Sequence, residues 1–169
     1  YEMLRSLVGS EMCIRDSLVK GGVNLKISTK GRYALRMLID LAMHQNDGYI
    51  ALKDIAARQN ISKKYLEQIM PILNKADVLL TNRGFQGGYR LARTPDQYTV
   101  GEILRITEGS LAPVACLDHT PNNCPMSEEC ITLPVWQGLN EVITKYLDGI
   151  TIQDIIDHQA ESIGNDYVI

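Results

Sequence analysis

The chain has 169 residues, 45% of them hydrophobic, and a formal net charge of −3. This length suits one compact domain or a small domain with an appendage. No run of about 18 consecutive apolar residues occurs, which excludes a transmembrane helix, and we expect no signal peptide because the basic-then-apolar order is missing. A cytoplasmic location is therefore expected, where cysteines serve as core thiols, metal ligands or redox centres rather than structural disulfides.

Charge is divided unevenly along the chain. Residues 26–93 carry 12 Lys/Arg and 5 Asp/Glu, a charge of +7, whereas residues 94–169 carry 2 and 12, a charge of −10. A basic segment suits a polyanion such as double-stranded DNA, although basic residues taken alone can also simply solvate a surface.

The first 25 residues show no helical or strand periodicity. Residues 10–17 resemble translated sequencing-adapter read-through. We expect residues 1–25 to be a non-native or disordered extension in which Cys13 has no function; an authentic flexible extension is the alternative.

Three helices are predicted between residues 28 and 73. The first begins near Thr29, the second covers residues 52–58, and the third follows Ser62, a good N-cap residue. A turn of only three residues joins the second helix to the third, which predicts a helix-turn-helix whose second helix enters the major groove of DNA. Apolar residues recur at helical spacing on one face of each helix: Ala34, Leu38, Leu41 and Ala42; Leu52, Ile55 and Ala56; Leu66, Ile69, Met70 and Leu73.

A β-hairpin is predicted next, with strands at residues 78–81 and 89–91 around a loop that holds three glycines. Such a loop alone is often only a turn. Directly after a basic helix-turn-helix it predicts a wing, in which Arg83 is suited to the minor groove. The predicted fold is therefore mainly α with a small β-hairpin wing.

The exposed face of the third helix is predicted to contact DNA. Lys63 and Lys64 suit phosphates or guanine, Gln68 suits adenine, and Glu67 can accept a hydrogen bond from the cytosine amino group. Solvated surface is the alternative for each residue alone. An isolated acid on a basic face favours base contact, because near phosphates it otherwise weakens binding.

Two further elements are predicted before the C-terminus. Residues 99–102 form a capping-box start for a helix that ends near Thr107. A long amphipathic helix then runs from Pro134 to near Gly149, and a short one begins at Thr151. The long helix presents one apolar stripe, which a second copy of the chain would cover to form a homodimer: Val135, Leu139, Val142, Ile143 and Tyr146.

Between these helices lies a loop with three cysteines, Cys116, Cys124 and Cys130. Three thiols in a polar loop with Pro and Asn favour a metal or cluster site over core packing. Zinc is an alternative, because His119 can complete a Cys3His set.

The chain resembles the IscR/NsrR-like (Rrf-type) winged-helix regulators over about residues 25–160. The resemblance rests on residues 27–34, 61–68 and 83–89 and on the cysteine loop before Trp136. It implies an iron–sulfur cluster, most often 2Fe-2S, on the three cysteines, a dimerising long helix and a palindromic operator. With the residue chemistry above, it gives this set of DNA-binding positions: Lys30, Arg32, Ser62, Lys63, Lys64, Tyr65, Glu67, Gln68, Arg83, Gly87 and Gly88.

The expected organisation is a winged helix-turn-helix domain at 26–110, a cluster-binding loop at 111–133, the dimerisation and C-terminal helices at 134–160 and a tail at 161–169. One position departs from the family pattern: some members place a histidine ligand three residues after the third cysteine, where this chain has Leu133. The fourth ligand is open among His119, Asp118, Glu128, Glu129 and a residue of the partner subunit.

Three functions remain open from sequence. The first is a regulator controlled by an iron–sulfur cluster, the second a regulator with a zinc or thiol-redox switch, and the third an electron-transfer protein. A dedicated electron carrier needs no basic helix-turn-helix and wing, so the third is weakest. An enzyme is disfavoured because no motif pairs His44, His119 or His158 with a nucleophile.

Overall fold

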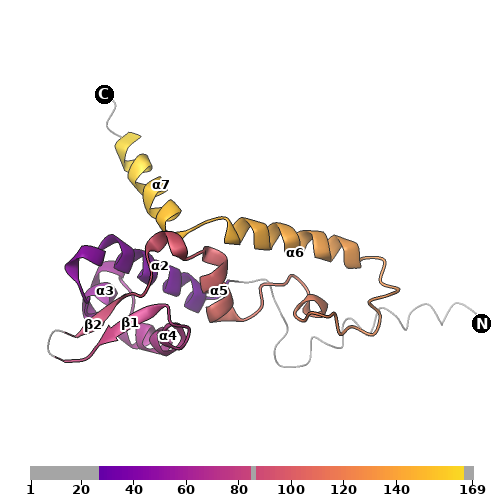
Figure 1. The fold of residues 1–169 in the computed structure, drawn as a ribbon, viewed down its shortest axis with the longest axis horizontal. Helices are drawn as coiled ribbons and strands as arrows, with labels where there is room; N and C mark the ends of the chain where they lie inside the picture. Colours follow the sequence, from indigo (N-terminus) through magenta and orange to yellow (C-terminus); the bar gives the residue numbers. More distant parts are fainter. Residues whose placement is uncertain (1–26, 85–86, 166–169) are drawn as a thin grey trace, which may run out of the picture. The chain divides into compact units, whose positions relative to one another are not determined.

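The computed structural model describes residues 27–84 and 87–165 (Figure 1). The described residues form two compact units: the winged-helix unit, residues 27–111 together with 141–165, and the cysteine-loop unit, residues 112–140. The predictions made for residues 1–25, including Cys13, lie outside the described residues. None of the helices in the described part of the chain has the length and apolarity that a membrane span requires.

The first predicted helix is confirmed as α2 (Thr29–Met43), and its predicted apolar face is buried. Ser28 is its N-cap: the hydroxyl oxygen accepts hydrogen bonds from the N–H groups of Lys30 and Gly31 at 3.1 and 3.4 Å. Glu108 supplies a second acceptor, because its Oε1 receives the Gly31 N–H at 3.1 Å. The short 3-10 helix η2 (Gln45–Asp47) follows α2.

The predicted helix-turn-helix is formed by α3 (Leu52–Gln59) and α4 (Lys63–Lys75). Asn60 reverses the chain between them in the left-handed conformation, with φ of 50°, and Ile61 is buried below the turn. All seven apolar residues predicted to face inward from these two helices are buried. Ser62 holds the N-cap position of α4, but its side chain makes no capping hydrogen bond. Ser62 is exposed, so water can satisfy the first N–H groups of α4.

The wing consists of β1 (Leu79–Asn82) and β2 (Gly88–Leu91), paired antiparallel with Thr81 opposite Tyr89. Ile50 forms an isolated antiparallel bridge with Tyr89 of β2, because the two backbones exchange hydrogen bonds of 3.0 and 2.9 Å. Gly88 lies so close to this bridge that an added Cβ would clash with the Ile50 carbonyl oxygen. The part of β2 nearest the loop is therefore attached to the segment that precedes α3.

Tyr98 completes the core beneath the wing. After the 3-10 helix η3 (Pro95–Gln97), its side chain is fully buried, and its hydroxyl donates to the Val78 carbonyl and accepts from the Arg93 N–H, both at 2.8 Å. The next helix is α5 (Val100–Glu108), capped by Thr99, whose Oγ1 accepts the Glu102 N–H at 3.1 Å. The Glu102 carboxylate pairs with Arg93 instead, so only the Thr99 half of the predicted capping box is seen.

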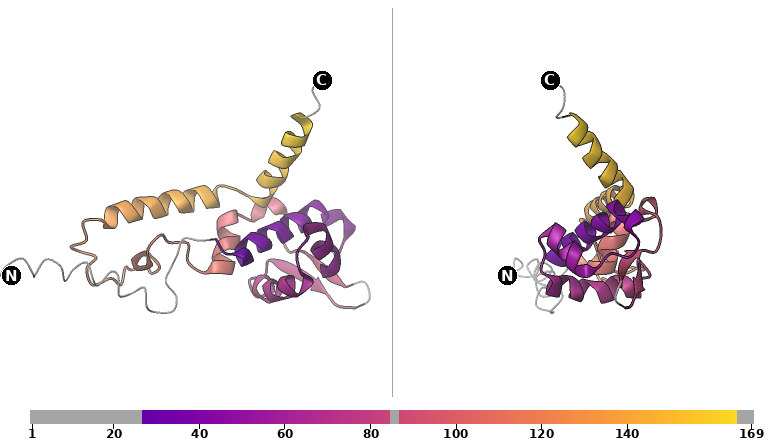
Figure 2. Two further views of the ribbon diagram at one scale, coloured as in Figure 1. Left: turned by 180° about the vertical axis from the view of Figure 1, so that it is seen from behind. Right: turned by 90° about the vertical axis from the view of Figure 1, so that its left-hand side faces the viewer.

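The last two helices are α6 (Leu133–Asp148), as predicted, and α7 (Ile152–Asn165), which is longer than the short helix expected. The chain after the cysteine loop returns to the winged-helix unit. Ile152 is fully buried, and its N–H donates to the Tyr98 carbonyl at 2.9 Å. Arg105 of α5 also forms an ion pair with Asp148 at the end of α6. The fold is thus mainly helical with one small antiparallel hairpin, as predicted, and Figure 2 shows α4 and the hairpin from two further sides.

Candidate nucleic-acid interface and cysteine loop

The exposed face of α4 carries four of the predicted DNA-binding residues: Lys63, Lys64, Glu67 and Gln68. They lie on the helix opposite the buried stripe of Leu66 and Ile69. Within this face Lys63 and Glu67 form an ion pair of 3.4 Å, one helical turn apart. Both side chains are more than half exposed, so this pair adds little to stability and can open when another charged group approaches.

A hollow of about 530 Å³ lies between α4 and the wing. Lys63 and Glu67 line it from α4, and Arg83 and Gly87 line it from the wing. Lys53 of α3 adds another positive charge. The structure therefore gathers predicted residues from two separate parts of the chain around one open, basic hollow, in the place where a winged helix-turn-helix receives a nucleic-acid backbone.

Three predicted positions, Lys30, Arg32 and Tyr65, do not line this hollow, and a fourth, Gly88, lines it as a buried glycine. Arg32 is exposed on α2, where its Nη2 donates to Thr29 Oγ1 at 3.1 Å, and Lys30 is half-buried in the first turn. Tyr65 is half-buried and packs edge-on against Tyr33, with ring centroids 5.3 Å apart. Gly88 lines the hollow, but it is buried, and its close approach to Ile50 gives it a packing role in the wing.

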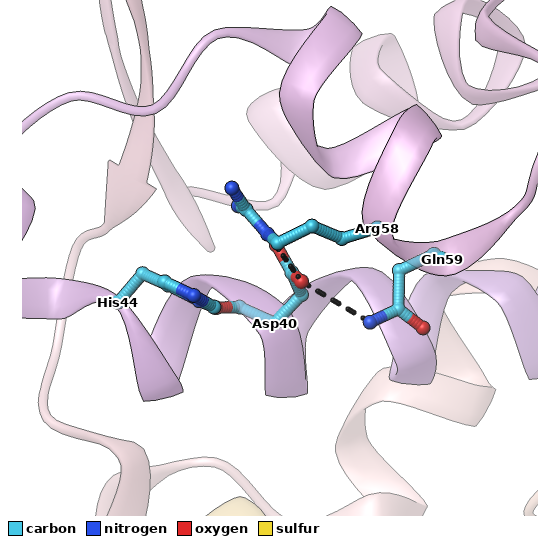
Figure 3. Close-up of polar contacts among 4 residues, drawn as sticks. All are labelled: Asp40, His44, Arg58 and Gln59. Carbon is cyan, nitrogen blue, oxygen red and sulfur yellow. Dashed lines mark hydrogen bonds and ion pairs between the residues drawn. The ribbon is translucent and has the colours of Figure 1, made fainter.

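A buried carboxylate on α2 holds the end of α3, the first helix of the helix-turn-helix, through hydrogen bonds (Figure 3). Asp40 of α2 is 2% exposed, and it accepts hydrogen bonds from Arg58 Nε and Nη2 at 3.0 and 2.7 Å and from Gln59 Nε2 at 3.1 Å. His44 Nδ1 lies 2.8 Å from the Asp40 backbone oxygen. Both donors to the carboxylate stand at the end of α3, so Asp40 sets where the turn into α4 begins.

The pKa of Asp40 reflects this environment. Burial raises the pKa, but the hydrogen bonds from Arg58 and Gln59, together with the Arg58 charge, outweigh burial and leave the pKa below its ordinary value. Asp40 was not predicted as a special residue. The sequence signal for it is an acid three residues after Met37, inside the buried phase of an amphipathic helix.

Cys116, Cys124 and Cys130 are half-buried in the cysteine-loop unit, and none of them forms a disulfide among the described residues. Cys116 lies in the 3-10 helix η4 (Ala115–Leu117). Asn122 Oδ1 accepts the Cys124 N–H at 2.8 Å. The pKa of Cys130 is below its ordinary value, because its sulfur interacts with Thr132, whose hydroxyl lies 3.5 Å away.

The donor chemistry of this loop suits an iron–sulfur cluster, but the described residues hold no group of three or more His, Cys, Asp or Glu side chains close enough together to bind one metal ion. Three thiols lie in a loop with little regular structure, and two buried polar atoms there, Asp118 Oδ1 and Asn122 Nδ2, have no hydrogen-bond partner. Unsatisfied buried polar atoms are rare in folded proteins and point to a missing ligand or a rearrangement. His119 is exposed.

The long helix α6 has no buried residue. Its apolar stripe is exposed, with Val142 at 66% and Tyr146 at 67% of their full surface. Val135 and Leu139 continue the stripe along the same helix. An uncovered stripe of this length is unusual for a helix that works alone.

Comparisons with known proteins agree with this architecture. Residues 27–158 match the family model Rrf2, described as an iron-dependent transcriptional regulator. The HTH-type transcriptional regulator IscR of Aliivibrio salmonicida is 34% identical over 142 residues, which cover 83% of each chain. The structure is similar to IscR of T. potens, with a TM-score of 0.65 and 39% identity over 81% of this chain and 90% of that one.

A second similar structure is CymR of B. subtilis, titled the global cysteine regulator. Its TM-score is 0.65, with 35% identity over 79% of this chain and 97% of that one. The relatives are transcriptional regulators and not enzymes, which confirms the predicted class of protein and the predicted resemblance. The chain therefore belongs to the Rrf2 family of transcriptional regulators.

Proposed function

We propose that this regulator is a cytoplasmic homodimer that binds a palindromic DNA operator under the control of an iron–sulfur cluster, of the 2Fe-2S type, held by Cys116, Cys124 and Cys130. The observation that carries the DNA part is the basic hollow between α4 and the wing. The cysteine loop carries the sensing part, because it supplies three thiols from one segment. When bound, the cluster supplies a redox-active and labile centre, and its gain or loss changes how the loop is held.

The proposed contacts divide into two kinds. Lys53, Lys63 and Arg83 neutralise phosphates or enter the minor groove, which positions the protein without reading sequence. Glu67 reads a cytosine amino group once Lys63 leaves the ion pair for a phosphate. Affinity thus depends on the basic residues, and base preference depends on Glu67.

The dimer is proposed to form through α6. Val135, Leu139, Val142 and Tyr146 on two copies bury one another, which removes an apolar stripe from water. A two-fold axis between two recognition helices explains a palindromic operator, with half-sites about one helical turn apart.

A thiol-redox switch is the second candidate, favoured by the likeness to CymR. A Staphylococcus aureus CymR structure, 32% identical to this chain, is titled as the oxidized form. In that reading the same cysteines respond by oxidation without iron. A zinc site with His119 is less favoured, because the His119 side chain is exposed.

Anaerobic purification separates these candidates. The cluster proposal predicts visible absorption bands from sulfur-to-iron charge transfer, with iron and acid-labile sulfide in equal amounts. A colourless protein that contains zinc, or no metal at all, would overturn the cluster and select one of the other two switches.

Selection from random duplexes, with light scattering of the protein, tests the rest. We expect an enriched, approximately palindromic sequence and a dimer mass. Recovery of no enriched sequence at moderate salt would contradict the operator, and a monomer mass at the concentrations used for binding would contradict the dimer.

A further inference from the structure

The last residue of α3, Gln59, is held by two side chains of α2. Asp40 Oδ1 accepts a hydrogen bond of 3.1 Å from the side-chain amide of Gln59 (Figure 3). Arg36, one turn before Asp40, donates from Nε to Gln59 Oε1 at 3.2 Å and from Nη2 to the Gln59 carbonyl oxygen. Both polar ends of the Gln59 side chain, and its backbone carbonyl, are therefore bonded to α2.

The Gln59 carbonyl benefits from such a donor because α3 ends there. The N–H groups of Asn60 and Ile61 turn back to carbonyls earlier in α3, and neither bond uses Gln59. The last carbonyls of a helix need partners from outside it, and a positive charge beside them is favourable. Arg36 thus caps α3 from a neighbouring helix.

The same guanidinium group is linked to α4 through an aromatic pair. Its central carbon lies 5.6 Å from the centre of the Tyr33 ring, within the range of a cation–π contact. Tyr33 packs edge-on against Tyr65 in the first turn of α4. Arg36 is therefore connected to the residues on both sides of the turn between α3 and α4.

These contacts bear on how α4 is presented to DNA. The turn has only three residues, 60–62, so holding both of its ends restricts the angle between α3 and α4. Hydrogen bonds to base edges require distances of about 2.7–3.2 Å, which a small tilt of α4 would break at Glu67. The flexible side chain of Lys63 can follow a phosphate through the same tilt. Base reading therefore depends on the orientation of α4 more than phosphate binding does.

Resting on the proposed DNA binding, we propose that Arg36 is a positioning residue for α4 and not a phosphate contact. Its charge belongs to the basic segment of residues 26–93, which makes a phosphate contact the alternative. The two roles differ in their salt dependence. A phosphate contact releases about one cation from DNA when it forms, whereas a positioning residue releases none.

The test compares Arg36→Ala and Arg36→Lys with the wild-type chain, on the selected operator and on an unrelated duplex. Arg83→Ala is the matched reference, because Arg83 is proposed to contact DNA directly from the wing. Each titration is repeated at several salt concentrations, below the melting temperature of every variant. Stoichiometric titration fixes the fraction of active protein, so that loss of folded protein is not read as loss of affinity.

We expect Arg36→Ala to lose about tenfold in operator affinity, the size of effect that one good base contact provides, with non-specific affinity and the salt slope unchanged. Arg36→Lys should resemble Arg36→Ala, because lysine keeps the charge but lacks the planar fork that holds both Gln59 oxygens. Arg83→Ala should weaken binding to both duplexes and reduce the salt slope by about one.

Gln59→Leu tests the same contact from the other side. Gln59 carries no charge, so its loss leaves the number of released cations unchanged. This variant should reproduce the loss of operator affinity in Arg36→Ala. The double variant should lose less than the sum of the two single losses, since both remove one shared contact.

Two results would overturn the positioning role. A salt slope reduced by about one in Arg36→Ala, with recovery in Arg36→Lys, would assign Arg36 to a phosphate. A lower melting temperature of Arg36→Ala with unchanged operator affinity would leave Arg36 as a stabilising contact only. If the wild-type chain selects no sequence from random duplexes, the proposed operator binding itself fails, before any variant is compared.

Discussion

Replacing Asp40 with Asn should loosen the helix-turn-helix while leaving side-chain volume almost unchanged. The Asp40 carboxylate accepts hydrogen bonds from Arg58 and Gln59 across the contact between α2 and α3. Asn keeps one acceptor oxygen but replaces the other with an NH2 group. This group is a donor, and it then faces the N–H donors of Arg58 and Gln59, which need acceptors. It also removes the charge that Arg58 faces.

The cost can be estimated from these contacts. Hydrogen bonds to charged groups contribute about 1.5–3 kcal/mol each, but Arg58 is 36% exposed and recovers part of its loss from water. Neutralising the buried Asp40 also relieves its desolvation. The expected net loss is about 2 kcal/mol, which lowers the melting temperature by about 4–8 °C in a chain of this size.

The assay is thermal and urea unfolding of the metal-free protein under reducing conditions, at one fixed protein concentration. Asp77→Asn is the matched control, because Asp77 is exposed and its left-handed backbone, with φ of 54°, accepts Asn equally well. Operator affinity should fall in Asp40→Asn but not in Asp77→Asn. Equal melting temperatures for the two variants would refute the reasoning.

The same variant makes a prediction about pH. Because the folded-state pKa of Asp40 is lowered, its contribution to stability is full above the unfolded pKa of about 3.9 and is lost as pH falls through the folded value. The difference in unfolding free energy between the wild type and Asp40→Asn should therefore be constant near neutral pH and shrink below about pH 4. A difference that stays constant into strong acid would mean that the ionised carboxylate is not what Asn removes.

Further predictions concern DNA, assembly and sensing. Glu67→Ala should relax base preference while leaving non-specific binding equal or stronger, as a competition assay would show; equal weakening on every sequence would mean that Glu67 reads no base. Arg83→Ala should weaken operator binding and reduce its salt dependence, measured by titration at several salt concentrations. Val142→Glu should shift the protein from dimer to monomer in sedimentation, because the buried charge would be unpaired. An unchanged dimer would mean that α6 does not form the dimer interface. Cys124→Ala should differ from the cluster-loaded wild type by about 5–150-fold in operator affinity, or should prefer a different site, since coupling of this kind is typically about 1–3 kcal/mol. Identical affinity and site preference would mean that the cysteine loop does not control DNA binding.

The helices and the wing followed from sequence because hydrophobic periodicity and turn residues report them directly. One helical spacing places four apolar residues on a single face, and all four are buried in α4: Leu66, Ile69, Met70 and Leu73. Gly88 is predicted to contact DNA, which stays a prediction, and its packing contact with Ile50 could not be foreseen from its place in a glycine-rich loop. That contact joins residues far apart in sequence, and periodicity carries no information about such pairings.

The network around Asp40 was missed for a similar reason. An acid in the buried phase of a helix signals a buried partner, but the partner, Arg58, lies in another helix and reads as one more basic surface residue. The fourth ligand stayed open because several oxygen donors lie at similar distances from the cysteines in sequence.

The return of the chain to the core at Ile152 has a consequence for how the protein is made. Synthesis proceeds from the N-terminus, so the three cysteines leave the ribosome before Ile152 does. The core around Tyr98 therefore closes only after the whole cysteine loop has been translated. A truncated product that ends within the loop lacks the side chain that fills this core, and we expect it to be poorly folded and degraded. Premature termination would then leave the cell without the regulator and would not produce a DNA-binding fragment that has escaped control.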